Sequence, residues 1–408
     1  MSGSLERTRR RRREGLDVVV VGGGMAGAAA ALALADEGCE VALVEAREPE
    51  PWRAEDEVDL RVVALAASSA QLLDRLGVWD DILAARACGY RHMHVWDAEN
   101  GAVLDFDAAD LQRRDLGWIV ENRLIQQCLW QALDAADVRR HCPASVERYT
   151  ADADGVRVHL DDERVLDARL LVAADGARSP LRAQAGIATR GRDYQQRGVV
   201  AHVRTEREHG YTAWQRFLPE GPIALLPLAD GRCSIVWTLP EARAREVLAL
   251  DDKAFRDAVG VATDFRLGPI LETTARAGFP LRLQLAERYA DARLVLLGDA
   301  AHAVHPLAGQ GVNLGLRDVV ELRDTIRDAR AADRDIGSAA VLRRYARRRR
   351  SADTFDARAF DGVERLFGVQ WSPFVTARGV GMRMLNRMGF AKRLLAGHAA
   401  GTLEPNPK

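Results

Sequence analysis

The segment LDVVVVGGGMAGAAAALALADEGCEVALVE, residues 16–45, decides the fold of this chain. Its apolar runs at 16–21 and 41–44 are predicted to be buried strands, and the alanine-rich run at 28–35 is predicted to be a helix between them. A glycine cluster separates the first strand from the helix. Strand, helix and strand in this order predict an α/β unit with parallel strands.

The glycine cluster has the spacing G-x-G-x-x-G and comprises Gly22, Gly24, Met25, Ala26 and Gly27. In this motif the first glycine permits a tight turn, the second lets a pyrophosphate approach the backbone, and the third lets the helix pack closely on the strand. Glu45 follows the second strand, where its carboxylate is expected to hold the hydroxyl groups of an adenosine ribose. The segment therefore predicts a dinucleotide site, and its position at the N-terminal end of the chain favours FAD.

A second ligand-binding element is predicted in LVLLGDAAHAVHPLAGQGVNLGLRD, residues 294–318. The run 294–297 has the length of a buried strand, and Gly298 and Asp299 follow it. Ligands of an open α/β sheet lie beyond the carboxyl ends of its strands, so Asp299 is expected to accept a hydrogen bond from a ribose or ribitol hydroxyl group. The later glycines are expected to let the backbone approach a flat ring. The alternative is a loop and helix start without a chemical role.

A third element follows the apolar run 170–174, where the sequence continues as Asp175, Gly176, Ala177, Arg178 and Ser179. Asp-Gly pairs also occur in plain turns, so this pattern alone is weak. Two such elements behind one dinucleotide motif support each other.

Two arginines are further candidates for the cofactor site. Arg61 lies where an alternating strand gives way to a helix near Ser68, and Arg123 lies at the start of a helix that follows the strand 118–121. An arginine at a helix start can reach a phosphate group. For both residues the alternative is an ordinary surface charge.

Four strand-like runs between 199 and 239, joined by Gly-Pro and Asp-Gly turns, predict an antiparallel sheet. Such a sheet would form one wall of a substrate pocket over the flavin ring. The candidate lining residues are Trp214, Phe217, Leu226 and Trp237. The alternative for each is an ordinary core position.

The two ends of the chain are basic. Residues 9–13 are all arginine and predict a flexible tail. From 360 to 395 large apolar side chains alternate with arginines, which suits helices that lie on a membrane or pack on a partner. A plain helical cap on the core is the competing interpretation.

Length, composition, net charge and cysteine count exclude several classes of function. The 408 residues are 48% hydrophobic and 29% charged, with a formal net charge of −1, which fits a globular protein and argues against a nucleic-acid binder. The five cysteines are scattered without C-x-x-C spacing, so no metal site is expected and the thiols are expected to be reduced, as in the cytoplasm. No apolar run is long enough to span a bilayer.

With these motifs in place, the chain resembles the class A flavoprotein aromatic hydroxylases. The segments DLRVVALAASS, WIVENRLIQQCL, GPIALLPL and HPLAGQGVNLGLRD resemble more narrowly the ubiquinone-biosynthesis hydroxylases, the UbiH, UbiI and UbiF group. The resemblance covers residues 16 to 401. It implies contacts of Glu45 with the adenosine ribose and of Arg123 with the FAD phosphates, and it gives Asp175 and Arg178 contacts with FAD and NAD(P)H.

For the ring, the resemblance implies that Asp299 binds the ribitol or pyrophosphate region and that residues 306–313 line the isoalloxazine. The expected residues there are His305 on the substrate side and Pro306, Gly309, Gln310, Gly311, Val312 and Asn313 at the ring. The residues assigned to catalysis are Pro306, Gly309, Gln310 and Gly311, and the backbone amides of residues 309–311 are expected to stabilise negative charge on the reduced ring.

The implied function is an FAD-dependent monooxygenase that hydroxylates the aromatic ring of a polyprenyl phenol or quinol through a C4a-hydroperoxyflavin. NAD(P)H would supply electrons and O2 the oxygen atom. The implied location is the cytoplasm with peripheral contact at the inner face of the plasma membrane, and a ubiquinone-biosynthesis complex is an implied partner. The alternatives are a hydroxylase of a soluble aromatic compound and a non-catalytic FAD-binding scaffold.

The predicted fold is α/β, with a Rossmann-like FAD-binding domain, an antiparallel substrate domain and C-terminal helices. The FAD-binding domain is predicted at 16–75, 100–190 and 275–340, and the substrate domain at 76–99 and 191–274. The flexible tail covers 1–15 and the helical region 341–408.

Overall fold

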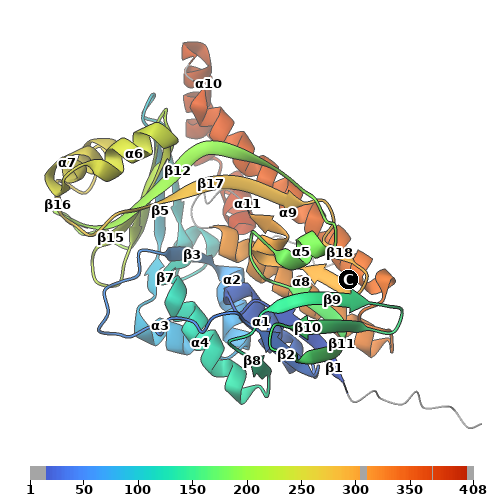
Figure 1. The fold of residues 1–408 in the computed structure, drawn as a ribbon. Coiled ribbons are helices and arrows are strands. Elements are labelled where there is room, and N and C mark those ends of the chain that lie inside the picture. The colour runs from blue at the N-terminus through green and yellow to red at the C-terminus, as the bar shows by residue number, and fades with distance from the viewer. Residues whose placement is uncertain (1–14, 304–309, 370, 402–408) are drawn as a thin grey trace, which may run out of the picture.

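The computed structural model describes residues 15–303, 310–369 and 371–401. In this part of the chain the strands form three sheets (Figure 1). The eight-stranded sheet and the nine-stranded sheet are the two main layers, and a three-stranded sheet lies against both of them. The predicted α/β class is confirmed.

The eight-stranded sheet contains the predicted α/β unit. Its strands are β1 Leu16–Val21, β2 Val41–Val44, β8 Arg139–His141, β9 Val146–Ala151, β10 Val156–Leu160, β11 Val165–Ala173, β18 Ala290–Asp291 and β19 Leu294–Leu296. The order is β18-β19-β11-β1-β2-β8, with β19, β11, β1, β2 and β8 parallel. The strands predicted at 16–21, 41–44 and 294–297 are confirmed as β1, β2 and β19.

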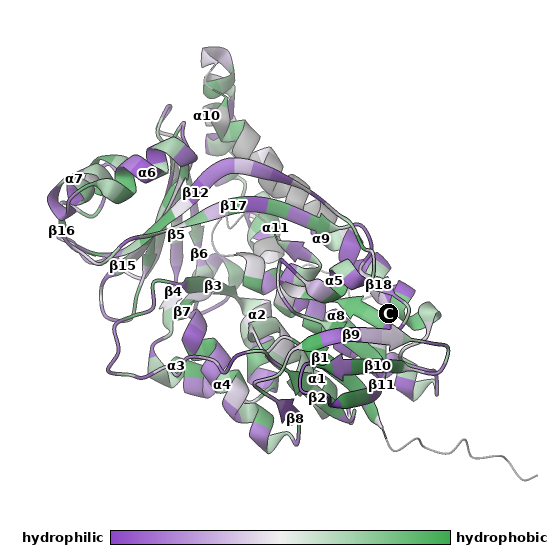
Figure 2. Ribbon diagram, in the orientation of Figure 1, coloured by the Kyte–Doolittle hydropathy of each residue, from purple (hydrophilic) through white to green (hydrophobic). Residues whose placement is uncertain are grey.

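Both faces of the central parallel strands are buried, so β1, β2 and β19 are apolar almost throughout, whereas β10 near the edge alternates buried and more exposed residues (Figure 2). Helices α1 Met25–Asp36, α4 Asn122–Ala135 and α8 Gln310–Ala331 pack on one face. The other face packs against β9 and β10 and the start of α5 Pro180–Gln184. The alanines of α1 are buried because small side chains let this helix pack closely between the sheet, α4 and α8.

The nine-stranded sheet forms the second layer. Its strands are β5 His92–Asp97, β6 Val103–Asp107, β12 Thr189–Thr205, β13 Thr212–Phe217, β14 Ile223–Pro227, β15 Cys233–Pro240, β16 Ile270–Thr273, β17 Ala277–Ala286 and β20 His302–Ala303. Its pairs are antiparallel except β5 with β13. The sheet includes β6, β17 and β20, which lie outside the ranges predicted for the substrate domain. The other domain boundaries stay a prediction.

The three-stranded sheet connects the two main layers. It consists of β3 Val62–Ala66, β7 Gly117–Glu121 and β4 Cys88–Tyr90 in the order β3-β7-β4. Ile119 of β7 packs against Ala213 and Leu226 of the nine-stranded sheet. Helices α2 Ala67–Arg75 and α3 Trp79–Ala85 follow β3 in the chain, and the short helix η1 Ala108–Leu111 follows β6.

The opposite face of the nine-stranded sheet is covered by α6 Glu241–Ala249 and α7 Asp252–Ala262 (Figure 1). The sequence predicts one helical stretch from 241 to 259. The structure divides it because the extended backbone of Leu250 ends α6 and the Asp251 carboxylate accepts a hydrogen bond from the Ala254 amide at 2.7 Å, which caps α7.

The C-terminal part consists of α9 Ala339–Gly368, α10 Ser372–Arg387 and α11 Gly389–Ala399. In Figure 1 α10 projects from the body of the protein. Among the described residues, none of the helices is long and apolar enough to cross a bilayer.

Candidate active site

The predicted ligand-binding elements meet at one edge of the parallel sheet. The register places Val21 beside Val44 and Ala173, and Ala173 beside Leu296, so four neighbouring strands end at the same level. The glycine cluster follows β1, Glu45 follows β2, Asp175 follows β11, and the short helix η2 Gly298–Ala300 follows β19. This carboxyl edge is where open α/β sheets bind their ligands.

In the glycine turn, Gly22 and Gly27 are closely packed, whereas Gly24 borders open space. Gly22 has φ +104°, and a Cβ atom there would lie 2.3 Å from the Ala174 oxygen. A Cβ atom on Gly27 would lie 1.9 Å from the Gly22 oxygen. At Gly24 a Cβ atom would meet no atom within 4 Å. The first and third glycines are therefore required by the fold, while the second borders a space that a ligand can occupy.

Glu45 is fixed beside this turn. Its Oε2 accepts a hydrogen bond from the Gly23 amide at 2.5 Å, and its Oε1 accepts one from the Arg47 amide at 3.0 Å. The Gly23 oxygen accepts hydrogen bonds from Trp130 Nε1 at 2.7 Å and from Gln126 Nε2 at 2.9 Å. These contacts hold the turn open at Gly24 and leave the Glu45 carboxylate half-buried at the strand end.

Asp175 carries an acceptor without a partner. Its Oδ2 accepts a hydrogen bond from the Leu181 amide at 3.2 Å, whereas its Oδ1 is buried and accepts none. Burial raises the pKa of this carboxyl group. Buried oxygens are normally hydrogen-bonded, so Oδ1 is an available acceptor for a ligand hydroxyl group. The Arg178 side chain is exposed nearby.

Arg182 is a site residue that the sequence analysis missed. This buried arginine on α5 donates hydrogen bonds to the Ala177 oxygen and the Ala300 oxygen, both at 2.8 Å. It thereby joins the segment after β11 to the segment after β19. The sequence indicates only its local position, because Ser179 followed by Pro180 is a helix-start pattern that places residue 182 in the first turn, and this pattern does not indicate the contact with Ala300.

Asp299 lies at the end of β19 with an exposed side chain. Partial loss of water around the carboxyl group raises its pKa, and the positive charge of His302 opposes this shift. Gly298 before it has φ +59° and packs against Gly315 of α8 and Ala26 of α1. The segments that the sequence analysis singled out at residues 22–27 and 294–318 are therefore in contact with each other.

Asn313 has a structural role that the sequence did not predict. Its side chain is buried, accepts hydrogen bonds from the Ala66 amide at 2.8 Å and Ser69 Oγ at 2.7 Å, and donates one to the Ala64 oxygen at 2.8 Å. These bonds join α8 to the end of β3. A contact of Asn313 with the flavin ring would therefore come from its backbone rather than from its amide group.

The two candidate arginines lie on the β3–β7 side of the site. The Arg61 guanidinium lies 4.7 Å from the centroid of the Phe279 ring. Arg123, at the start of α4, has Nε 3.5 Å from Asp59 and Nη1 3.8 Å from Glu50. Their contacts with a cofactor stay a prediction.

The loop predicted to face the ring lies partly outside the described residues, which exclude His305, Pro306 and Gly309. Gln310 and Gly311 begin α8, and Val312 is half-buried in its first turn. The catalytic assignment of these backbone amides stays a prediction.

The candidate substrate residues lie on opposite faces of the nine-stranded sheet. Trp214 and Trp237 pack on the face that α6 and α7 cover. Leu226 packs on the other face, toward the three-stranded sheet. Phe217 stacks on Phe367 of α9 with ring centroids 3.8 Å apart.

A cavity of about 320 Å³ lies at the β5–β6 end of this sheet. Its lining residues are His92, Met93, His94, Asp105, Phe106, Asp107, Thr212, Trp214 and Lys392. Among the described residues, none of those predicted to bind the cofactor lines it, and Trp214 is the one predicted substrate residue that does.

The residues at the strand ends fit FAD. The open space at Gly24, next to the N-terminus of α1, suits a pyrophosphate. The carboxylates of Glu45, Asp175 and Asp299 suit ribose and ribitol hydroxyl groups, and Asp175 Oδ1 lacks a protein donor. From Gly298 the chain passes from the parallel sheet into the nine-stranded sheet, where His302 of β20 pairs with Leu285 of β17. The cofactor edge and the second layer are thus directly connected.

Comparison with known proteins agrees with this fit. The profile of a family described as "FAD binding domain" matches residues 15–361. The 3-demethoxyubiquinol 3-hydroxylase of Escherichia coli K12 is 38% identical over 377 residues, which cover 92% of this chain and 96% of the relative. The ubiquinone hydroxylase UbiL of Rhodospirillum rubrum is 37% identical over 393 residues, covering 96% of this chain and 91% of the relative. The human mitochondrial ubiquinone biosynthesis monooxygenase COQ6 is 35% identical over 384 residues, covering 83% of this chain and 82% of the relative.

Solved structures share the fold at lower identity. The p-nitrophenol 4-monooxygenase PnpA of Pseudomonas putida DLL-E4 has a TM-score of 0.76 and 21% identity, covering 95% of this chain and 98% of that protein. The HpxO protein of Klebsiella pneumoniae, in complex with FAD and uric acid, has a TM-score of 0.69 and 22% identity, covering 93% of this chain and 97% of that protein.

Proposed function

The chain belongs to the family of FAD-dependent ubiquinone-biosynthesis hydroxylases, and we propose that it hydroxylates the aromatic ring of a polyprenyl phenol or quinol intermediate. The observation that carries the proposal is the meeting of the glycine turn, Asp175 and Asp299 at one sheet edge, in a chain similar to such hydroxylases over nearly its whole length.

FAD, once reduced, supplies the activation of O2 that this hydroxylation requires. The protein binds and orients the cofactor. The turn at Gly24 and the N-terminus of α1 receive the pyrophosphate, and Glu45, Asp175 and Asp299 accept hydrogen bonds from hydroxyl groups. NAD(P)H is the proposed electron donor, bound transiently, because the sequence has a single dinucleotide motif.

Incubation of the purified, FAD-loaded protein with 18O2, NADH or NADPH and two matched substrates tests this function. One substrate is a prenylated phenol and the other is the same ring without the prenyl chain. We expect one labelled oxygen atom in the product and kcat/KM at least tenfold higher for the prenylated ring. Preference for the bare ring would make the protein a hydroxylase of soluble aromatics. Absence of product with either ring would leave a non-catalytic FAD scaffold.

A polyprenyl substrate resides in a membrane, and we further propose that α10 and α11 contact an anionic lipid surface. Large apolar side chains are exposed there, with Trp371 69%, Val380 55%, Met384 62% and Phe390 70% exposed. Such side chains on helices suit the interfacial region of a bilayer.

The charge of the same helices favours an anionic lipid surface over a protein as the partner of this region. Residues 365–403 contain no aspartate or glutamate, while Arg383, Arg387 and Arg393 are exposed there. A surface that is both apolar and purely basic complements an anionic membrane.

Flotation of the full-length protein with vesicles tests this contact. We expect flotation with vesicles that contain phosphatidylglycerol and little flotation with pure phosphatidylcholine. The double variant Met384→Gln/Phe390→Gln should lose at least tenfold in partitioning. Val261→Gln/Phe265→Gln is the matched control, since these apolar side chains are also exposed but lie at the end of α7. Equal flotation of the two double variants would overturn the contact and favour a protein of a ubiquinone-biosynthesis complex as the occupant.

A further inference from the structure

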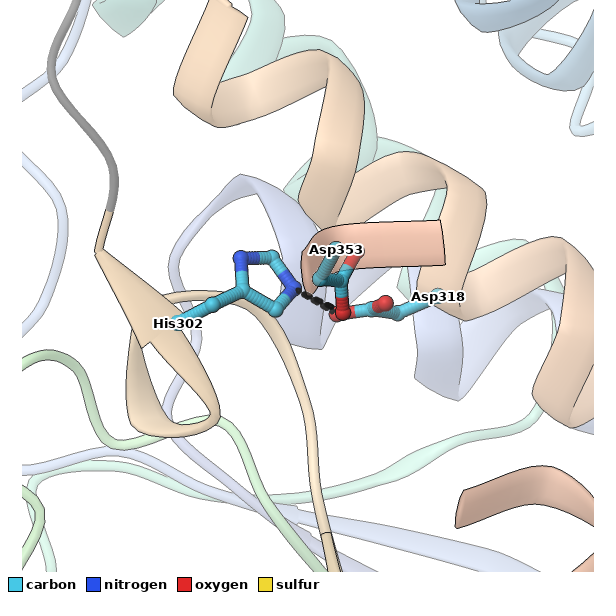
Figure 3. Close-up of side chains that lie close together, drawn as sticks. All are labelled: His302, Asp318 and Asp353. Atoms are coloured by element: carbon cyan, nitrogen blue, oxygen red, sulfur yellow. Dashed lines mark hydrogen bonds and ion pairs between the residues drawn. The ribbon is translucent and has the colours of Figure 1, made fainter. Parts of the chain in front are cut away.

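Four charged side chains lie together in the interior directly behind the cofactor segment 298–302. They are His302 of β20, Asp318 of α8, and Arg349 and Asp353 of α9, and all four are buried. Figure 3 shows the His302 ring directed at the carboxylates of Asp318 and Asp353. Buried charges are costly unless they are paired, so each of these residues needs the others.

The cluster is an ion-pair network rather than a cation site. His302, Asp318 and Asp353 each offer an atom within 4.8 Å of the others, a spacing that metal ligands also have. However, Arg349 donates from Nε to Asp318 Oδ1 at 2.5 Å and from Nη2 to Asp353 Oδ1 at 2.6 Å. The guanidinium already supplies the positive charge between the two carboxylates, and a metal ion would have to displace it.

Asp318 holds both ends of the cofactor segment with one oxygen. Its Oδ2 accepts a hydrogen bond from the Gly298 amide at 2.8 Å and another from His302 Nε2 at 2.7 Å. Asp299, the predicted cofactor contact, lies between these two anchored residues. Since the other oxygen of Asp318 is bound to Arg349, the carboxylate has no freedom to rotate away from the segment.

His302, Asp318 and Arg349 stabilise one another's charges, whereas burial and then the Asp318 carboxylate raise the pKa of Asp353 to about 6. Burial alone would lower the pKa of His302, but the carboxylates of Asp318 and Asp353 raise it to about 9. Burial opposes the ionised form of Asp318, yet His302 and Arg349 hold its pKa below the ordinary value. At neutral pH the bond from His302 to Asp318 therefore joins two ions, which makes it about twice as strong as a neutral one.

The other groups that face His302 come from three further places. Tyr289, which precedes β18, has its ring 6.1 Å from the imidazole. Arg349 opposes the protonation of His302, and Asp299 lies three residues before it. Among these groups Asp318 makes the shortest contact with the imidazole.

We propose that Asp318 is a positioning residue for FAD, which acts through Gly298 and His302 to hold Asp299 in the orientation that binds the cofactor, while Arg349 and Asp353 hold Asp318. This inference rests on the cofactor site of the proposed function and goes beyond it, because Asp318 itself lies behind the segment. It assigns a cofactor-related role to three residues of α8 and α9.

Titration of the apo-protein with FAD tests the proposal without any substrate. Asp318→Asn should raise the FAD dissociation constant at least tenfold at pH 7.5. Asp328→Asn is the matched control, since Asp328 lies on the same helix, has a side chain that is 42% exposed and is ion-paired with Arg344. Its dissociation constant should stay within twofold of the wild-type value.

The pH profile separates positioning from a general structural defect. Wild-type affinity should weaken as the pH rises through about 9, where His302 loses its charge. In Asp318→Asn this inflection should move to lower pH, because the charge that favours the imidazolium is gone. A variant that is weaker by the same factor at every pH, or that binds FAD as the control does, would overturn the proposal.

A second variant keeps the test decisive if Asp318→Asn does not fold. His302→Gln retains a donor toward Asp318 but carries no proton to lose, so its FAD affinity should have no inflection near pH 9. An unchanged inflection would overturn the proposal. A wild-type protein that binds no FAD at all would instead remove the proposed function and this inference with it, whereas FAD binding without hydroxylation would leave the inference standing.

Discussion

Arg182 donates a hydrogen bond from Nη1 to the backbone oxygen of Ala300 at 2.8 Å, across 118 positions of sequence. A second bond, from Nη2 to the Ala177 oxygen at 2.8 Å, closes the bridge on its own side. One buried guanidinium therefore sets the spacing between the two segments that carry Asp175 and Asp299. The site depends on this spacing because both carboxylates must reach the same cofactor.

Replacing Arg182 should harm both stability and cofactor binding. Arg182→Met keeps much of the side-chain volume but leaves two buried carbonyl groups without their donor, which should lower the free energy of unfolding by about 2–4 kcal/mol. FAD affinity should fall at least tenfold. Urea unfolding and FAD titration measure the two effects. Arg190→Met is the control, because Arg190 is largely exposed and paired with Glu287, and it should change stability by less than about 0.5 kcal/mol.

The glycines of the first turn should separate folding from binding. Gly24→Val places its side chain in open space, so the protein should fold but should purify without FAD. Gly27→Val brings a Cβ atom to 1.9 Å from the Gly22 oxygen, so the fold itself should suffer. Absorbance at 450 nm and circular dichroism distinguish these outcomes. A yellow, fully loaded Gly24→Val protein would exclude Gly24 from the pyrophosphate site.

Asp299→Ala should give a folded protein that is largely free of flavin. The side chain is exposed, so its removal costs little packing, while a hydroxyl acceptor is lost. The flavin-to-protein ratio after gel filtration is the measurement. Asp291→Ala serves as the control, because Asp291 pairs with Arg288 just before β19 and is remote from the strand end. Full flavin occupancy in Asp299→Ala would remove this residue from the site.

The sequence was sufficient for the elements at the parallel edge because each had its own local signal. Glycine spacing, apolar runs and strand-end acids identified Gly22–Gly27, Glu45, Asp175 and Asp299, and the structure places them along one sheet edge. These signals depend on residues close in sequence, where strand and turn geometry constrain the choice.

Long-range contacts lacked such a signal. The bond of Arg182 to Ala300 and the network around Asp318 join positions far apart in the sequence, and an isolated arginine or aspartate on a helix looks like a surface residue. In the nine-stranded sheet, too, the sequence does not reveal contacts between distant segments. Side chains alternate between the faces of a strand, so Trp214 and Phe217, three positions apart, point to opposite faces. The sequence does not say which face α6 and α7 cover, and the structure places Trp214 on that face.

Stability should fall between pH 7 and pH 9 because of His302. Its folded pKa of about 9 lies above the ordinary value of 6.5, so the folded protein binds more protons than the unfolded chain in this range. The contribution is fully present below about pH 6.5 and is lost as the pH rises through 9. His141, His202 and His209, whose pKa values are lowered by burial, change protonation below this window.

Urea unfolding of the apo-protein at pH 7 and 9 should show a loss on the order of 1–3 kcal/mol in the free energy of unfolding. His302→Gln should abolish most of this difference, and an unchanged slope would contradict the assignment.

The ion pair between Asp97 and Arg378 should hold the C-terminal helices to the substrate sheet. Arg378 Nε lies 2.7 Å from Asp97 Oδ2, both side chains are buried, and Arg378 Nη1 also donates to the Leu366 oxygen at the end of α9 at 2.8 Å. Arg378→Met leaves the buried Asp97 carboxylate without its counter-charge and should cost about 3–5 kcal/mol. Arg383→Met, on the exposed side of the same helix, is the control and should cost less than about 0.5 kcal/mol.

A second substitution reveals whether the unpaired charge causes that loss. Asp97→Asn removes the charge and keeps an oxygen that can accept the Glu99 amide, which Asp97 Oδ1 now accepts at 2.9 Å. The double variant Arg378→Met/Asp97→Asn should therefore be more stable than Arg378→Met alone, by about 1–3 kcal/mol. Chymotrypsin cleavage after Trp371, which is 69% exposed just before α10, should follow the same order, because the pair and the bond to Leu366 hold α10 to the end of α9. If the double variant unfolds at lower urea than Arg378→Met, the loss comes from packing of the arginine rather than from its charge, and the C-terminal helices are held by apolar contacts such as Phe217 on Phe367.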